Sequence, residues 1–207
     1  MAVSLWLLSK QTSLSHFYAL YFLYGALGNA IVSSPLYANV GFWFHTNPGL
    51  AMGVTAAGGA FGQGLVPYLV GMMIDTEGWR AAYVAMAWSY LAIALPLALL
   101  IRESPSRTQA RTTPSSPPPD APVSEVEAVA WVSIAVVFCC TCMAVPIVHL
   151  VPLLTDTGHT VEYATRALMV LMFTGVLGRI MGGRLADSIG ALRAYMMMSL
   201  GQTVSVF

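Results

Sequence analysis

Long apolar stretches without a charged residue alternate with short polar turns along this chain. No Asp, Glu, Lys or Arg occurs in residues 11–74, 81–101, 128–155 or 194–207. A helix in water needs a polar face, and stretches of this length and composition do not supply one. A membrane-spanning helix needs about 20 apolar residues, because its backbone polar groups must all pair within the segment. The pattern therefore predicts an all-α protein, a polytopic bundle of transmembrane helices.

Turn residues divide the apolar sequence into six segments, and a short apolar stretch at residues 1–9 reads as the end of a further helix. Each segment is long enough to be a transmembrane helix or the start of one. The six segments are residues 14–43, 49–74, 80–101, 128–154, 164–182 and 194–207.

Residues 102–127 have a different composition from the rest of the chain. They contain six of the twelve prolines, with Ser, Thr and Arg, and almost nothing that a core can bury. Such a segment predicts a disordered polar linker. It divides the chain into residues 1–101, the end of an N-terminal helical half, and residues 128–207, the start of a C-terminal helical half.

The overall composition agrees with a membrane protein and excludes other classes. Hydrophobic residues make up 57% of the chain and charged residues 9%, against roughly 25% charged in a soluble domain. The formal net charge is +0, so no field attracts nucleic acid. The lipid bilayer is therefore the expected partner.

The arginines indicate how the helices are oriented in the membrane. One cluster lies in the linker and a second lies around residues 182–193, and two spans separate them, so both must face the same side. Positively charged loops are typically cytoplasmic. We therefore expect a multi-pass protein of the plasma (inner) membrane with a cytoplasmic linker. The two clusters are Arg102, Arg107 and Arg111, and Arg179, Arg184 and Arg193.

No set of residues indicates catalysis, a metal site or a cofactor. Cys139, Cys140 and Cys142 lie too close together on one helix to converge on one ion, because successive helical residues point about 100° apart. They are expected to be small buried side chains. The metalloprotease H-E-x-x-H pattern, the hydrolase G-x-S-x-G pattern and the P-loop do not occur in the sequence. We therefore expect no enzyme activity.

The most specific motif lies at residues 178–190, GRIMGGRLADSIG. It resembles the loop signature of the major facilitator superfamily, although Ser188 stands where a basic residue is usual. Glycines there allow two helix ends to approach closely, and the acid can pair with a helix N-terminus or an arginine. The resemblance implies a gating motif on the cytoplasmic side, formed by Gly183, Arg184, Asp187, Gly190 and Arg193.

Three further stretches resemble monocarboxylate-carrier-like members of that family, namely residues 43–58, 75–80 and 149–156. Asn47 and Pro48 replace a basic pair that is usual in the first of these. The resemblance runs from about the end of the family's third helix to the start of its ninth, so we expect this chain to be an incomplete piece with a partial major facilitator-type fold. It implies a secondary active transporter of a small solute, an organic anion or monocarboxylate, that works by alternating access with a possible coupling proton.

Small residues recur every four positions in the 49–74 segment, which predicts close packing between helices. This contact is either a sliding surface used in transport or a static one, and the sequence does not decide between them. The predicted packing residues are Gly53, Gly58, Gly62 and Gly64.

A few polar residues fall within the apolar segments and are candidates for a substrate cavity. Asn29, Ser33 and Tyr37 share one helical face, and Gln63 lies midway along the next segment. Polar groups at this depth need partners or water, so they line a cavity or form hydrogen bonds between helices. His149, between two prolines, either binds a carboxylate or relays a proton, or is a hydrogen-bonded histidine near the membrane interface.

Two other functions remain to be weighed against transport. The chain is alternatively a non-transporting integral membrane protein of about six spans with an interaction or structural role. The motif at residues 183–190 counts against this reading. A membrane-embedded enzyme is disfavoured because the sequence lacks a catalytic constellation.

Overall fold

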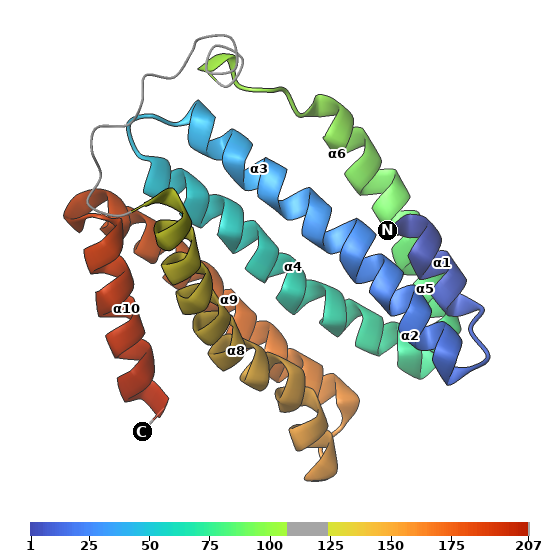
Figure 1. Cartoon of the computed structure of the whole chain (residues 1–207). Helices are drawn as coiled ribbons and strands as arrows, with labels where there is room; N and C mark the ends of the chain where they lie inside the picture. Colours follow the sequence, from blue (N-terminus) through green and yellow to red (C-terminus); the bar gives the residue numbers. More distant parts are fainter. Residues whose placement is uncertain (107–123, 207) are drawn as a thin grey trace.

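The computed structural model describes residues 1–106 and 124–206, and every element in them is helical (Figure 1). This confirms the all-α prediction. In chain order the elements are α1 (Ala2–Ser9), α2 (Leu14–Leu23), the π-helical segment η1 (Tyr24–Asn29), α3 (Ala30–Trp43), α4 (Pro48–Glu77), α5 (Trp79–Ser89), the π-helical segment η2 (Tyr90–Ala94), α6 (Leu95–Leu100), α8 (Glu125–Asp156), α9 (Val161–Ile189) and α10 (Ala191–Val206).

Four helices of the described part are long and apolar enough to cross a membrane: Pro48–Glu77, Trp79–Leu100, Val126–Asp156 and Val161–Ile189. In addition, α2, η1 and α3 follow one another without a break and cover the predicted 14–43 segment. In the most apolar part of α8, 0% of the residues are buried inside the protein. Such an apolar outer surface suits lipid and not water. The chain is a multi-pass membrane protein.

The helices begin and end at residues with a clear physical reason. Ser124 starts α8 with a capping box, in which its hydroxyl accepts from the Glu127 N–H and the Glu127 carboxylate accepts from the Ser124 N–H. Gly78 and Gly190 follow α4 and α9 at φ values of +82° and +93°. Residues with a Cβ atom rarely adopt this backbone conformation, so glycine is well suited to both helix ends.

Proline explains one of the two π-helical segments. Pro96 has no N–H group and cannot bond to the carbonyl of Ala92, one helical turn earlier. Ala92 lies within η2, where backbone hydrogen bonds join residues five positions apart instead of four. The long predicted span 80–101 therefore continues through α5, η2 and α6 with a local change of helix type.

The two long helices α4 and α9 lie side by side along most of their length, as Figure 1 shows. Around this pair, α3 and α5 contact α4, whereas α8 and α10 contact α9. The helix α1 packs against α5 and α2. Because α4 precedes residue 101 and α9 follows residue 128, the α4–α9 pair joins the two predicted halves of the chain.

Both ends of the predicted 102–127 linker take part in ordered structure. Residues 102–106 lie against the end of α3, and Ser104 is only 1% exposed. At the other end, residues 125–127 form the first turn of α8. The sequence prediction of a disordered linker is corrected for these residues. The same prediction for residues 107–123 lies outside the described residues.

Candidate functional site

The carboxylate of Asp187 on α9 binds the N-terminus of α4. Its Oδ1 accepts from the Gly49 N–H and its Oδ2 accepts from the Leu50 N–H, both at 2.7 Å. The bond between Gly49 and Asp187 connects residues that lie 138 positions apart in the chain. Negative charge is favourable at a helix N-terminus, where the N–H groups are unpaired and the helix dipole is positive.

The start of α4 explains why it needs an acceptor from another helix. Pro48 occupies the first turn and has no N–H group to pair. The Asn47 side chain forms no cap hydrogen bond, and the Ala51 N–H already bonds to the Asn47 carbonyl. The N–H groups of Gly49 and Leu50 are the ones that need an outside partner, and Asp187 supplies one oxygen to each.

Glycines allow the two helices to approach at this point. A Cβ on Gly49 would lie 2.5 Å from the Gly183 carbonyl oxygen and 2.6 Å from the Asp187 Oδ1. A Cβ on Gly53 would lie 2.5 Å from the Arg179 carbonyl oxygen. Distances below 3.0 Å do not occur for real Cβ atoms, so a side chain at either position would displace the helices. The hydrogen bonds of Asp187 therefore depend on glycine at 49, 53 and 183.

The same face of α4 continues the contact toward its other end. A Cβ on Gly64 would lie 2.8 Å from the Met172 Cβ, and one on Gly71 would lie 3.2 Å from the Thr165 Cγ2. The rings of Phe61 and Phe173 stack with centroids 5.1 Å apart at the edge of this surface. We call this surface the α4 seam. It consists of Gly49, Gly53, Ala57, Ala60, Gly64 and Gly71.

Two of the four predicted packing residues lie off the α4 seam. A Cβ on Gly58 or Gly62 would meet no atom within 4 Å in the part of the chain that the structure describes. The prediction is therefore corrected for these two glycines, whereas Gly53 and Gly64 pack as expected. The reason is geometric: successive helical residues point about 100° apart, so Gly58 and Gly62, five and nine residues after Gly53, point about 140° and 180° away from it. The observed seam stays on one face because it mixes steps of three and four.

The remaining residues of the predicted gating motif surround Asp187 without binding it. Gly190 ends α9, and Arg184 and Arg193 are exposed. Among described residues, the carboxylate of Asp187 has no arginine within 4.0 Å, so the alternative of an ion pair at this site is not found. The Arg179 guanidinium instead points to Met143 of α8, with its Nη2 3.8 Å from the sulfur.

The candidate cavity residues are not brought together by any described contact. Gln63 is exposed on α4 and His149 is exposed on α8, whereas Tyr37 on α3 is half-buried. The side chains of Asn29 and Ser33 lie outside the described residues. The sequence prediction that these positions line a substrate cavity thus stays a prediction.

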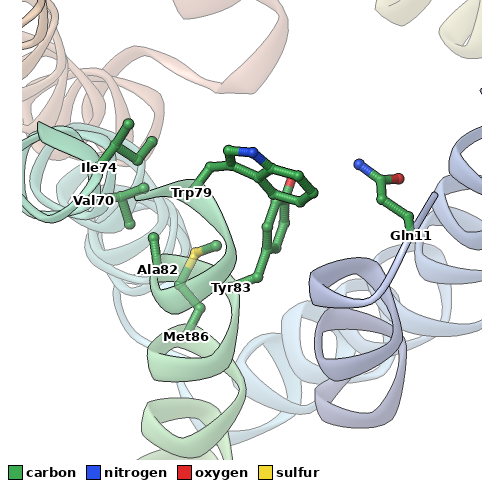
Figure 2. A pocket seen from close by; sticks show the side chains of 7 residues that line it. All are labelled: Gln11, Val70, Ile74, Trp79, Ala82, Tyr83 and Met86. Carbon is green, nitrogen blue, oxygen red and sulfur yellow. The ribbon is translucent and has the colours of Figure 1, made fainter. Parts of the chain in front are cut away.

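A separate cavity lies at the end of the helices opposite to Asp187. It has a volume of about 300 Å³ and lies between the α1–α2 connection, the end of α4 and the start of α5. Figure 2 shows the Gln11 side chain extending toward Trp79 and Tyr83 across this cavity. The Gln11 Oε1 is buried without a hydrogen-bond partner among described residues. The Tyr83 hydroxyl pairs with that of Tyr21 at 2.6 Å.

The cysteines differ from expectation in one respect. Cys140 and Cys142 are exposed and Cys139 is half-buried, so the predicted burial is wrong for these side chains. The outer surface of a helix in lipid is as apolar as a protein core, and a small apolar side chain suits either one. A search of the described residues found no group of three or more potential metal ligands.

Sequence reasoning missed a contact at the Asp187 end of the helices. The Asn39 side chain on α3 binds the backbone of residues 102 and 104, and the Trp43 indole also donates to the Arg102 carbonyl. An asparagine in the last turns of an apolar helix is a weak signal on its own, since its partners lie more than sixty positions away.

The helices and their exposed apolar surface define the class of this protein as a multi-pass membrane protein whose two groups of helices meet at α4 and α9. The sequence profile of the Major Facilitator Superfamily matches residues 1–207, so the chain belongs to that family. The curated relatives that it matches are named as transporters.

The curated relatives of this chain are named as transporters of different solutes. The chain is 39% identical over 67 residues to the riboflavin transporter RibJ of Trypanosoma brucei brucei, covering 32% of this chain and 12% of the relative. It is 32% identical over 99 residues to monocarboxylate transporter 12-B of Danio rerio, covering 48% and 21%. It is 26% identical over 167 residues to an MFS-type transporter of Gibberella moniliformis, covering 80% and 39%.

The chain thus aligns with less than half the length of these relatives. No solved structure matches it.

Proposed function

We propose that this chain forms part of a secondary transporter that moves a small organic solute across the plasma membrane by alternating access. The contact between Asp187 and the N-terminus of α4 supports this proposal. It joins one helix from each side of residues 102–127 and consists of only two hydrogen bonds at one end of the α4–α9 pair. Such a contact can form in one state and break in the other without disturbing either helix.

The proposed gate favours the state that is closed at the Asp187 end. When this end opens, the two hydrogen bonds between the Asp187 carboxylate and the N–H groups of Gly49 and Leu50 break. Each of these groups then forms hydrogen bonds with water instead. Hydrogen bonds to a charged group contribute about 1.5–3 kcal/mol each when sheltered, and less in an exposed position such as this one. An effect of about 1.4 kcal/mol shifts a two-state equilibrium tenfold, so this contact is strong enough to bias the carrier and weak enough to release.

The positive-inside rule places this end in the cytoplasm, with residues 102–127 on the same side. The arginines of the linker and of residues 184–193 support that orientation. In this proposal the Asp187 contact is a cytoplasmic gate, and the connections at residues 10–13, 78 and 157–160 are extracellular.

We propose a small organic anion as the solute class, with monocarboxylates first. The resemblance of residues 43–58, 75–80 and 149–156 to monocarboxylate carriers supports this choice, as does the relative named as a monocarboxylate transporter. Riboflavin is the second candidate, because two relatives named as riboflavin transporters also match. The candidate cavity residues Asn29, Ser33, Tyr37, Gln63 and His149 would supply the polar groups.

Uptake into proteoliposomes tests the proposed function. Vesicles that contain the carrier are incubated with radiolabelled lactate, pyruvate or riboflavin, with and without a proton gradient. Saturable uptake of one solute, inhibited by an excess of the same unlabelled solute, is expected. If a folded preparation shows no uptake above that of empty vesicles for any of the three, the proposed solute classes are wrong, and the alternative of a non-transporting membrane protein gains support.

A further inference from the structure

We infer that Asn39 is a positioning residue for the cytoplasmic gate: it ties residues 102–104 to the end of α3 and thereby fixes the turn that presents α4 to Asp187. This inference rests on the proposed function, because it assigns Asn39 a role in that gate. We call residues 102–106 the strap, since they follow α6 and lie across the end of α3.

The carboxamide of Asn39 uses its donor and its acceptor on the same segment of backbone. Its Nδ2 donates to the Arg102 carbonyl at 3.0 Å, and its Oδ1 accepts from the Ser104 N–H at 3.0 Å. The carboxamide thus pairs with the Arg102 carbonyl and the Ser104 N–H in the way that the backbone of a neighbouring β-strand would. A carboxamide of this length supplies both groups at once, whereas an aspartate offers only acceptors and an alanine offers neither.

The rest of the strap completes the contact. The Ser104 hydroxyl donates to the Phe42 carbonyl at 2.9 Å. Carbonyls in the last turn of a helix lack a partner within the helix, so this bond satisfies a group that would otherwise need water. The Trp43 Nε1 donates to the Arg102 carbonyl at 3.4 Å, and Ser104 is 1% exposed. Ser104 is therefore the buried anchor of a specific contact, whereas Arg102, Glu103 and Pro105 of the strap are exposed.

A short turn connects the strap contact to the gate. Only residues 44–47 separate the end of α3 at Trp43 from the start of α4 at Pro48. Within this turn, the His45 Nε2 and the Ser106 Oγ of the strap lie 3.1 Å apart. Two residues after the turn, Gly49 and Leu50 direct their N–H groups to Asp187. A shift at the end of α3 must therefore move these donors.

The geometric tolerance at the gate makes such a shift important. Both hydrogen bonds of Asp187 are 2.7 Å long, and the backbones of Gly49 and Gly183 are in contact. Hydrogen bonds weaken steeply as their distance and angle depart from these values. Without the strap, the end of α3 loses the hydrogen bonds of Asn39, Trp43 and Ser104, and the position of α4 relative to Asp187 is less well defined.

Two measurements test the inference in the complete carrier in lipid nanodiscs. The first is hydrogen–deuterium exchange of the peptide that contains Ser104. Asn39→Ala should speed exchange of the Ser104 amide about tenfold or more, because its acceptor is gone. Asn47→Ala is the matched control: Asn47 lies in the turn that follows α3, its side chain forms no cap hydrogen bond, and its replacement should leave this exchange unchanged.

The second measurement reads the gate itself. Cys139, Cys140 and Cys142 are replaced, and Ala57 on the buried α4 seam is changed to Cys as a reporter for a water-soluble maleimide. Asn39→Ala and Asp187→Asn should each speed labelling about fivefold or more. The double variant should label no faster than Asp187→Asn alone, because Asn39 acts through the contact that Asp187 makes. Ser104→Ala, which keeps both backbone bonds to Asn39, should have a smaller effect in the same direction.

The outcomes separate this inference from the proposed function. If the effects of Asn39→Ala and Asp187→Asn multiply, or if Asn39→Ala leaves Ser104 exchange unchanged, Asn39 does not position the gate and the inference is overturned while the gate stands. If Asp187→Asn does not change labelling, the gate itself is wrong. Should Asn39→Ala fail to fold, Asn39→Asp decides, because an aspartate keeps the length of the side chain but cannot donate to the Arg102 carbonyl, and an unchanged labelling rate in that variant overturns the inference.

Discussion

A Cβ atom on Gly49 would lie 2.5 Å from the carbonyl oxygen of Gly183, so the backbones of α4 and α9 are in direct contact beside Asp187. This relationship gives the first prediction. Gly183→Ala should lower the free energy of unfolding by about 1–3 kcal/mol, the usual cost of overpacking a tight contact. The measurement is the thermal unfolding midpoint in detergent.

Gly58→Ala is the matched control for this prediction. It lies on the same helix pair, but its Cβ would meet no described atom within 4 Å. Alanine is the better helix former by about 0.5–1 kcal/mol, so this variant should be as stable as the parent or slightly more stable. Equal losses in both variants would show that the α4–α9 contact is not the reason for the effect.

The second prediction concerns the amide oxygen of Gln11, which has no hydrogen-bond partner among described residues and lies in the cavity of Figure 2. A buried acceptor without a partner costs about 1–3 kcal/mol. Gln11→Met keeps the length of the side chain and removes that acceptor, so it should raise the free energy of unfolding by about 1 kcal/mol. Gln202→Met, at an exposed position, is the control and should change little. A loss of stability specific to Gln11→Met would indicate that its amide has a partner such as water.

The third prediction concerns the proposed substrate cavity. Asn29, Ser33, Tyr37 and Gln63, replaced one at a time by Cys in a carrier without native cysteines, should react with a water-soluble maleimide. Leu99→Cys is the control, because Leu99 is 80% exposed on an apolar face that should contact lipid. The control should not react, and a lack of labelling at all four cavity positions would contradict the assignment and favour hydrogen bonding between helices.

The fourth prediction concerns topology. Reporter fusions after Ser115 and Ala191 should both indicate the cytoplasm, and a fusion after Gly158 should indicate the outside. The reason is the arginine content of the first two regions, which the positive-inside rule places in the cytoplasm. Opposite results for Ser115 and Ala191 would show that the number of spans between them is wrong.

The sequence was sufficient to predict the helices, and it offered a helix N-terminus or an arginine as the partner of Asp187. Long stretches without charge leave a helix in lipid as the main solution, and an acid between glycines at a helix end has few suitable partners. The sequence did not show that α4 supplies this N-terminus. That assignment depends on Pro48 and Asn47, which leave two N–H groups of α4 without a local partner.

Other features could be predicted only in part or not at all. The prediction of the packing glycines was half correct because the small residues of α4 occupy more than one face of the helix, and only the position of α9 shows which glycines face it. The partners of Asn39 lie 63 and 65 residues away, on a segment whose composition suggests disorder. Contacts at such separations depend on the tertiary fold and leave no periodic signal in the sequence.

The central claim is that the Asp187 carboxylate holds the N-terminus of α4 and so favours the state closed at this end. The most direct measurement is the distance between spin labels at Thr46 and Leu192, two exposed positions beside the gate, by pulsed electron paramagnetic resonance in nanodiscs. Asp187→Asn removes the charge and replaces one acceptor oxygen by a donor that faces an N–H group. The population ratio of long to short distances should rise about fivefold to tenfold, as expected for a change of about 1–1.4 kcal/mol. Asp156→Asn, at the opposite end of the helices, should leave the distances unchanged. An unchanged distance distribution in Asp187→Asn would contradict the account and would show that this residue only caps a helix.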